Sequence, residues 1–331
     1  FKSTPKRLVK WEIFRMSLMS ILKSSAPKCK EVKEIIKSVA PKKTDFKTYS
    51  DIPPFTNYEV LSEHKLTSSY DSGLVGTAFD YLSKIICAYH TNTEFSAKEF
   101  ERPKITSFLE ETKNKSILTL YKKMQNHIDS LLANKSNTLE ISEEFIGGII
   151  LMAKLENLWR SGFLPVATKK DILKPTDKVV YDDISSLVKN FDDVFIKNGL
   201  VKPDSLITYN PRYSANIRVA LGGIDADICI DETLYDFKST KNQGFMIKDS
   251  MQITSYYLFY LMDRIMSSTV QMQCHRIERI ALYKARFGQI EYFDVKNIPE
   301  KDLKHAISEL NRMFKLGMPE QKIKDFKAYS A

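Results

Sequence analysis

The sequence predicts a mixed α/β fold in which a small β-sheet is enclosed by helices. Apolar residues recur at helical spacing through most of residues 1–200. After Pro211 the pattern changes to short runs of branched residues, in the order strand, strand, helix, strand, strand. Because long helices precede these strands, we expect a mixed β-sheet core flanked by helices, with extra helices at the N-terminus.

The first part of the chain is expected to be helical, with one irregular stretch. Residues 41–75 contain Pro53-Pro54 and a run of Ser, Thr and Asp, so no regular element is predicted there. Gly162 stands where a helix would end. The predicted helices lie at residues 7–24, 28–39, 75–91, 104–134, 141–161 and 181–199.

The strands of the predicted core lie in the last third of the chain. Residues 216–230 are predicted to form one strand, and 233–240 the strand that returns after a tight turn at Asp231-Glu232. The rest of the core is predicted as a long buried helix at 246–266, two strands within 276–295 around Phe287-Gly288, and a last helix at 299–315.

The positive charge is concentrated at the N-terminus. The net charge is +9, and residues 1–50 hold 13 Lys or Arg against 4 Asp or Glu, so the rest of the chain is nearly neutral. We therefore expect a basic helical segment at residues 1–70, and a second domain at 71–331 with a helical insertion around 92–200. The basic segment suits a phosphate backbone or an acidic protein partner, and a Lys-rich solubilising surface explains the surplus equally well.

Cysteine usage and hydropathy exclude some classes of protein. The four cysteines lie far apart without CxxC spacing, which argues against a zinc ribbon and favours free thiols in a reducing cytoplasm. They are Cys29, Cys87, Cys229 and Cys274. No uninterrupted apolar run approaches the roughly 20 residues of a membrane span, so we expect a cytoplasmic protein with no membrane contact.

The predicted hairpin carries the candidate chemistry. Asp236 and Lys238 are two residues apart on a strand, so their side chains share one face, while Phe237 points to the other face and a core. On the opposite strand Asp225 and Asp227 also share a face. A two-residue turn places Asp227 opposite Asp236 and Asp225 opposite Lys238.

Three carboxylates on one patch of sheet repel one another unless a cation lies between them. A hard divalent ion with oxygen ligands fits such a patch, so we expect Mg²⁺ (or Mn²⁺), with the carbonyl of Phe237 as a further ligand. The ion would serve phosphodiester hydrolysis. Lys238 would orient or deprotonate water, or stabilise charge in the transition state.

A surface hairpin with cross-strand salt bridges is the alternative reading, and the D-x-K triplet alone favours it. Two further features favour a site. Gly222-Gly223 precede the acids, where a close backbone approach or a bulge is expected. Gln252 and Tyr256 lie one helical turn apart on one face of the following helix.

The motifs GGIDAD (222–227), DFK (236–238) and QITSY (252–256) together resemble the PD-(D/E)xK nuclease superfamily. The resemblance is to the RecB-like branch, which includes the RecB nuclease domain and the CRISPR-associated spacer-acquisition nucleases. That branch also has an upstream helix with a Gly followed four residues later by a metal-ligating His. Here the run GTAFD (76–80) has Asp80 in that place.

The resemblance implies a restriction-endonuclease-like fold and a metal-dependent nuclease that acts on nucleic acid, expected to be DNA. Asp80, Asp236 and one or both of Asp225 and Asp227 would hold the metal. Lys238 would be the catalytic lysine. Two residues of the following helix, Gln252 and Tyr256, would position the phosphate or the nucleic-acid backbone.

Several alternatives stay open at this point. The G-x-x-D register selects Asp225, whereas the hairpin pairing selects Asp227. Arg160 either pairs with Glu156 four residues earlier on its helix or reaches a phosphate beside the cleft, and Arg286 is a similar candidate. As an alternative to catalysis, the chain would be a nucleic-acid-binding module of nuclease fold without catalysis of its own.

Overall fold

A central sheet of six strands runs through the protein in the order β1-β6-β5-β4-β3-β2. The computed structural model describes residues 16–100, 103–112, 114–135, 139–224, 226–266 and 276–325. Asp225, Cys274 and residues 7–15 of the helix predicted over 7–24 therefore lie outside the described residues. The strands are β1 (Lys47–Thr48), β2 (Ile207–Tyr209), β3 (Ile228–Ile230), β4 (Thr233–Lys238), β5 (Arg279–Lys284) and β6 (Gln289–Asp294).

The sheet is mixed, because β4 and β5 are parallel while the other neighbouring strands are antiparallel. The parallel pair follows from the long helix between the two strands, since a crossover is needed to return the chain in the same direction. The predicted mixed α/β core is confirmed in this form. The edge strands β1 and β2 are too short to leave a periodic pattern, and the sequence did not predict them.

The hairpin has the predicted register, since Ile228 pairs with Tyr235 and Ile230 with Thr233. Asp231 adopts a φ of 51° in the tight turn between the two strands. The prediction of one long strand over 216–230 is wrong. Its first part forms a short helix, and Gly222-Gly223, with φ angles of 58° and 124°, separate that helix from β3.

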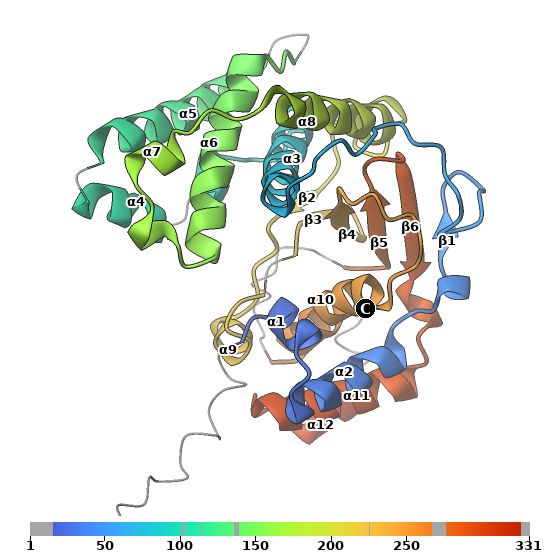
Figure 1. The fold of residues 1–331 in the computed structure, drawn as a ribbon. Coiled ribbons are helices and arrows are strands. Elements are labelled where there is room, and N and C mark those ends of the chain that lie inside the picture. Colours follow the sequence, from blue (N-terminus) through green and yellow to red (C-terminus); the bar gives the residue numbers. More distant parts are fainter. Residues whose placement is uncertain are drawn as a thin grey trace, which may run out of the picture.

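Helices cover both faces of the sheet (Figure 1). They are α1 (Leu18–Lys23), α2 (Pro27–Val39), α3 (Ser69–His90), α4 (Pro103–Glu111), α5 (Lys115–Ala133), α6 (Glu143–Arg160), α7 (Lys169–Ile172), α8 (Lys178–Phe191), α9 (Ala215–Ala220), α10 (Ile247–Met266), α11 (Glu300–Phe314) and α12 (Glu320–Lys324). The predicted helix over 104–134 is two helices, α4 and α5. Helix α3 begins six residues before the predicted start, where Ser68 accepts hydrogen bonds from the amides of Tyr70 and Asp71.

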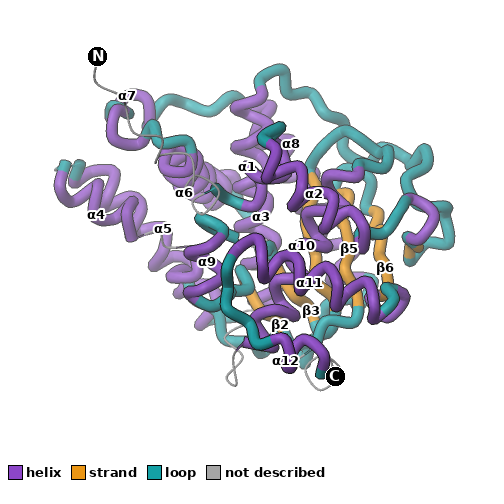
Figure 2. The backbone as a smooth tube through the Cα atoms, turned by 90° about the horizontal axis from the view of Figure 1, so that it is seen from below, coloured by secondary structure: helices purple, strands orange, loops and turns teal. Residues whose placement is uncertain are grey.

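Alternate residues of each strand enter two different cores. Leu234, Ile280 and Leu282 pack with α1, α2, α10 and α11 on one face. Tyr235 and Tyr283 pack with α3, α5, α6 and α8 on the other. The view in Figure 2 shows α2, α10 and α11 lying across the strands. Because β4 is covered by α10 on one face and α3 on the other, its C-terminal end lies between these two helices.

None of the described helices has the length and apolar content that a membrane-spanning helix requires.

Candidate functional site

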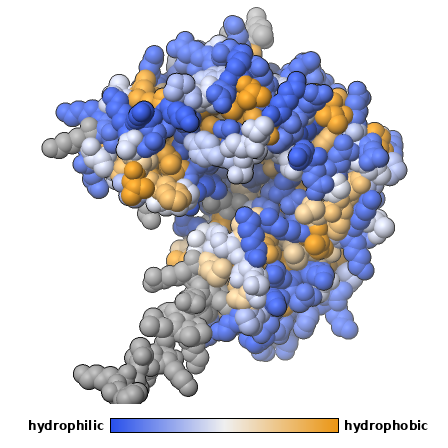
Figure 3. All heavy atoms as spheres, in the orientation of Figure 1, coloured by the Kyte–Doolittle hydropathy of each residue, from blue (hydrophilic) through white to orange (hydrophobic). Residues whose placement is uncertain are grey.

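The candidate site lies at the C-terminal end of β4, where strand alternation separates two kinds of side chain. Phe237 joins a cluster of rings with Phe79 of α3, Phe191 of α8 and Tyr283 of β5. The neighbouring side chains on β4 therefore point to the opposite face, towards α10. Figure 3 shows that the surface is hollowed between the lobe of α4 to α7 and the helices α1 and α9.

A hydrogen-bonded network joins β4 to α10. The ammonium of Lys238 lies 2.6 Å from Asp236 Oδ2 and donates to Gln252 Oε1 at 3.0 Å. The amide nitrogen of Gln252 donates to Asp236 Oδ1 at 3.2 Å and contacts the Tyr256 hydroxyl at 2.9 Å. Asp236, Gln252 and Tyr256 are all buried. The structure therefore brings together four of the residues that the sequence singled out.

Asp249 is a member of this network that the sequence analysis missed. Its Oδ1 lies 3.5 Å from the ammonium of Lys238, which therefore has a carboxylate on each side. Asp249 is three residues before Gln252, so both lie on one face of α10. Helical spacing could have found it, because any residue at that offset from Gln252 shares its face.

Asp80 approaches the site from α3, on the other side of the sheet end. A Cβ added to Gly76 would lie 3.3 Å from Ser239 Oγ, directly after β4, so the absent side chain lets α3 come close to the strand. Lys84, one turn after Asp80, pairs with Asp80 Oδ2 at 2.7 Å and donates to Asn210 Oδ1 at 2.6 Å. The other carboxylate oxygen of Asp80 is buried and has no hydrogen-bond partner among the described residues.

Asp227 lies one residue before β3, beyond the last pair of the hairpin ladder. Its carboxylate accepts a 2.8 Å hydrogen bond from the backbone N–H of Phe237, so it lies beside the end of β4 rather than in the ladder. Its own carbonyl accepts from the backbone N–H of Asn210 at 3.1 Å. Asn210 also accepts a hydrogen bond from Lys84, which pairs with Asp80. Asn210 therefore connects Asp227 to Asp80 through Lys84.

The electrostatics of these acids reflect crowding and burial. Burial raises the pKa of Asp80 to about 6, with Lys84 opposing the shift and Asp227 adding to it. Burial and the neighbouring Asp236 raise the pKa of Asp227 to about 6. Burial also raises the pKa of Asp236 against the effect of Lys238. Each carboxylate is therefore costly to ionise without a cation nearby.

The pKa of Lys238 is also raised, and for a lysine a raised pKa favours the charged form. Burial lowers the pKa of its ammonium, but the charges of Asp236 and Asp249 outweigh burial and raise the pKa above its usual value. The lysine is therefore protonated at neutral pH. Lys84 pairs with Asp80, and Lys238 lies between Asp236 and Asp249, so the protein carries two internal cations among its carboxylates.

The donor set suits a hard divalent cation. In the part of the chain that the structure describes, no three His, Cys, Asp or Glu side chains are close enough together to hold a metal as they stand. Nevertheless, Asp80 presents a buried carboxylate oxygen without a hydrogen-bond partner, and Asp80, Asp227 and Asp236 interact electrostatically with one another. Oxygen donors of this kind are those that Mg²⁺ and Mn²⁺ prefer.

Arg160 makes the intrahelical ion pair that its spacing predicts, with its Nε 2.6 Å from Glu156 Oε1. Glu156 is buried and also accepts a hydrogen bond from the Tyr81 hydroxyl of α3. One residue further on, Asn157 bonds Thr77 of α3 at 2.9 Å. The C-terminal end of α6 is therefore fixed beside α3 near Asp80, while about half of the Arg160 side chain is exposed.

Arg286 has a structural position and does not reach the hollow. Its guanidinium is buried and bonds both carboxylate oxygens of Asp183 at 2.6 and 2.7 Å, while its Nε donates to the Ser239 carbonyl at 2.7 Å. Of the two alternatives left open for Arg286, these contacts support the ion pair rather than a phosphate contact. The residue instead ties α8 to the segment that leaves β4.

No protein-family model matches this chain, and no curated protein or solved structure gives a significant match.

Proposed function

We propose that this protein is a metal-dependent nuclease that hydrolyses phosphodiester bonds, with DNA as its substrate and a restriction-endonuclease-like fold. The observation that carries the proposal is the contact of Lys238 with both Asp236 and Gln252, which joins the D-x-K triplet to the helix after it. A solvated salt-bridge ladder needs no buried glutamine between its acid and its lysine. Here the amide bonds both charged groups and is itself buried.

Asp80, Asp227 and Asp236 would hold the divalent ion, with Asp225 and the carbonyl of Phe237 as further ligands in the proposal. The ion would supply Lewis acidity at a phosphoryl oxygen. The acids are suited to this role because their raised pKa values show that each is poorly compensated in the protein alone.

Lys238 would act as a fixed cation rather than as a base, because Asp236 and Asp249 keep it protonated. A cation held in a partly desolvated site stabilises negative charge that develops on a transferring phosphoryl group. Gln252 holds the ammonium in place and Tyr256 holds the amide, so the geometry is set before substrate binds. Arg160, exposed at the end of α6, would contact a phosphate of the same strand.

Cleavage of DNA by the purified protein tests this proposal. With Mg²⁺ or Mn²⁺ the protein should degrade a labelled DNA, and Asp236→Asn and Lys238→Met should each lower the rate by at least about 100-fold. Asp263→Asn is the matched control, because Asp263 is a buried aspartate of α10 that accepts a hydrogen bond from the Ser214 amide outside the site. Its rate should stay within a few fold of that of the wild type.

Two results would overturn the proposal. Cleavage that survives both Asp236→Asn and Lys238→Met would show that the chemistry lies elsewhere. A wild-type protein that binds DNA equally well in EDTA and in Mn²⁺ and never cleaves it would instead be a binding module of the same fold.

A further inference from the structure

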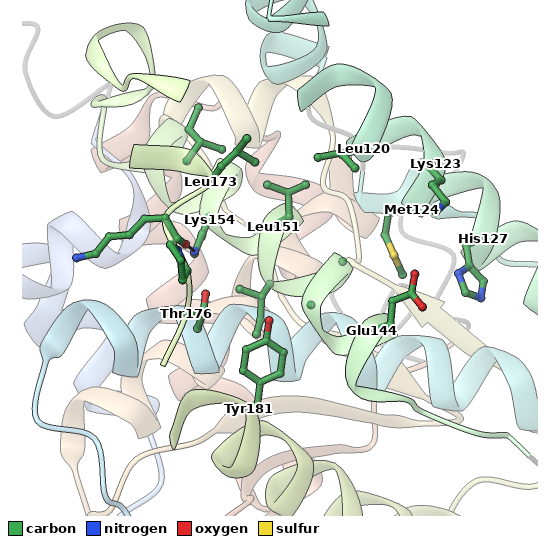
Figure 4. Close-up of a pocket in the computed structure, with 16 residues that line it drawn as sticks. Leu120, Lys123, Met124, His127, Glu144, Leu151, Lys154, Leu173, Thr176 and Tyr181 are labelled. Atoms are coloured by element: carbon green, nitrogen blue, oxygen red, sulfur yellow. Dashed lines mark hydrogen bonds between the residues drawn. The ribbon is translucent and has the colours of Figure 1, made fainter. Parts of the chain in front are cut away.

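A pocket of about 350 Å³ lies in the helical lobe, away from the candidate nuclease site. Its walls come from α5, α6, the segment after α7, and α8 (Figure 4). Leu120 and Met124 of α5 face Leu151 of α6 across it, and Tyr181 of α8 closes one side. This volume lies in the range of pockets that take small organic molecules.

Two adjacent glycines of α6, Gly147 and Gly148, form part of the pocket wall. In a helix interior glycine is destabilising relative to alanine, so a pair of glycines calls for a structural reason. A Cβ at Gly148 would overlap the sulfur of Met124, and one at Gly147 would lie 3.2 Å from the Tyr181 hydroxyl. Larger residues at these positions would therefore displace the side chains that shape the pocket.

Lys154 is the charged group buried in this pocket. The residue is 7% exposed, and its ammonium donates to the backbone carbonyl of Lys174 at 2.6 Å. Among the described residues, no carboxylate forms an ion pair with it. Asp71 acts on it only at longer range, and burial lowers its pKa. A buried ammonium with this environment is costly unless an anion is supplied.

The other charges around the pocket do not provide that anion. Glu144 lies on the side of the pocket opposite Lys154, near Lys123 and His127 (Figure 4). Lys174 adds a second positive charge on the Lys154 side. Leu120 and Leu173 expose apolar surface at the mouth, with 43% and 38% of each residue accessible. The pocket thus combines apolar walls with an excess of cations at one end.

We propose that this pocket binds an apolar molecule that carries one carboxylate or phosphate group, with the anionic group on Lys154 and the apolar part against Met124, Leu151 and Tyr181. The ligand would supply the charge that Lys154 lacks and would cover the exposed apolar rim. The proposal uses no residue of the candidate nuclease site, so it stands or falls independently of nuclease activity.

Isothermal titration calorimetry on the full chain tests this proposal with three probes of equal chain length: decanoate and decyl phosphate below their micelle concentrations, and decanol below its solubility limit. At least one of the two anions should bind saturably, about tenfold or more tighter than decanol. Whether the carboxylate or the phosphate binds tighter identifies the preferred head group. Lys154→Met should remove the preference for the anion, because a side chain of similar length then fills the site without its charge.

Two controls locate the binding. Lys178→Met removes an exposed lysine of α8 that pairs with Glu143 and does not line the pocket, so it should leave anion affinity unchanged. Leu151→Trp should fill the pocket and weaken all three probes about tenfold or more while retaining Lys154. The proposal fails if no anion binds saturably, if decanol binds as tightly as the anions, or if Lys154→Met keeps the preference.

Discussion

Lys238, the last residue of β4, donates a 3.0 Å hydrogen bond to the side-chain oxygen of Gln252 in α10. The same amide donates to Asp236, two residues before the lysine, and meets the hydroxyl of Tyr256. A single glutamine thus bonds both the acid and the cation of the triplet.

Gln252→Ala is expected to lower kcat/KM for DNA cleavage by about 10- to 100-fold, because the lysine loses its fixed position while Asp236 remains. Steady-state kinetics with a short labelled duplex and single strand would measure the change. Tyr256→Phe keeps the ring and removes only the contact with Gln252, so its loss should be smaller than that of Gln252→Ala. A Gln252→Ala enzyme with wild-type kinetics would contradict a positioning role for the amide.

Gly76→Val should impair cleavage more than Gly73→Val does. Both glycines lie in α3, so the intrinsic helix cost of valine is the same at each position. A Cβ at Gly76 meets Ser239, whereas one at Gly73 meets nothing within 4 Å. The added methyl groups at Gly76 would push α3 from the end of β4 and move Asp80.

The measurement for this pair is cleavage rate together with the free energy of unfolding in urea. We expect Gly76→Val to lose about tenfold or more in rate relative to Gly73→Val. Equal rates for the two variants would show that the close approach at Gly76 does not position Asp80.

Glu291 should make stability depend on pH. Burial raises the pKa of Glu291 to about 7, while Lys284 and hydrogen bonds from Tyr58 and Phe55 oppose the shift. The ordinary pKa of a glutamate, which applies to Glu291 in the unfolded chain, is 4.5. Between these two values the folded protein holds a proton that the unfolded chain has lost. The contribution of Glu291 to the free energy of unfolding therefore falls as pH rises from 4.5 to 7. Above pH 7 the carboxylate is ionised in both states, and this contribution falls no further.

Glu291→Gln should remove this slope, because the amide cannot ionise and retains the oxygen that accepts from Tyr58 and Phe55. Urea unfolding across this pH range measures the effect, expected to be on the order of 2–3 kcal/mol in favour of the variant above pH 7. Glu278→Gln, at a half-exposed position, serves as the control and should follow the wild type. The prediction would be contradicted if the free energy of unfolding changed with pH in the same way for Glu291→Gln and for the wild type.

Arg286→Ala should be strongly destabilising, by about 3–5 kcal/mol, because Asp183 would be left as an uncompensated buried charge. The exposed pair of Arg312 and Glu309 provides the contrast, and Arg312→Ala should destabilise the protein far less, because a solvated ion pair contributes little to stability. Chemical denaturation at neutral pH compares the two. If Arg286→Ala lowered the free energy of unfolding no more than Arg312→Ala does, a structural role of the buried pair would be contradicted.

Much of the local structure could be predicted from the sequence because it depends on short periods. Alternation along β4 predicts that Phe237 enters a core while its neighbours face the other way, and the ring contacts of Phe237 agree. Helical spacing predicts that Gln252 and Tyr256 meet, and they contact each other at 2.9 Å. The strand predicted over 216–230 failed because branched residues in a short helix resemble a strand in composition.

The chain by itself thus determined the hairpin register, the helix that follows it and the residues offered to the site. Only the tertiary structure decided the neighbours of those residues. Asn210 reaches Lys84 across 126 positions and Arg286 reaches Asp183 across 103, and no periodic pattern links such distant residues. The tertiary structure also decided the charges, because burial between α3, β4 and α10 raises the pKa values of Asp80 and Asp227. Spacing sets which face a side chain occupies, whereas desolvation and long-range contacts set what that side chain can do.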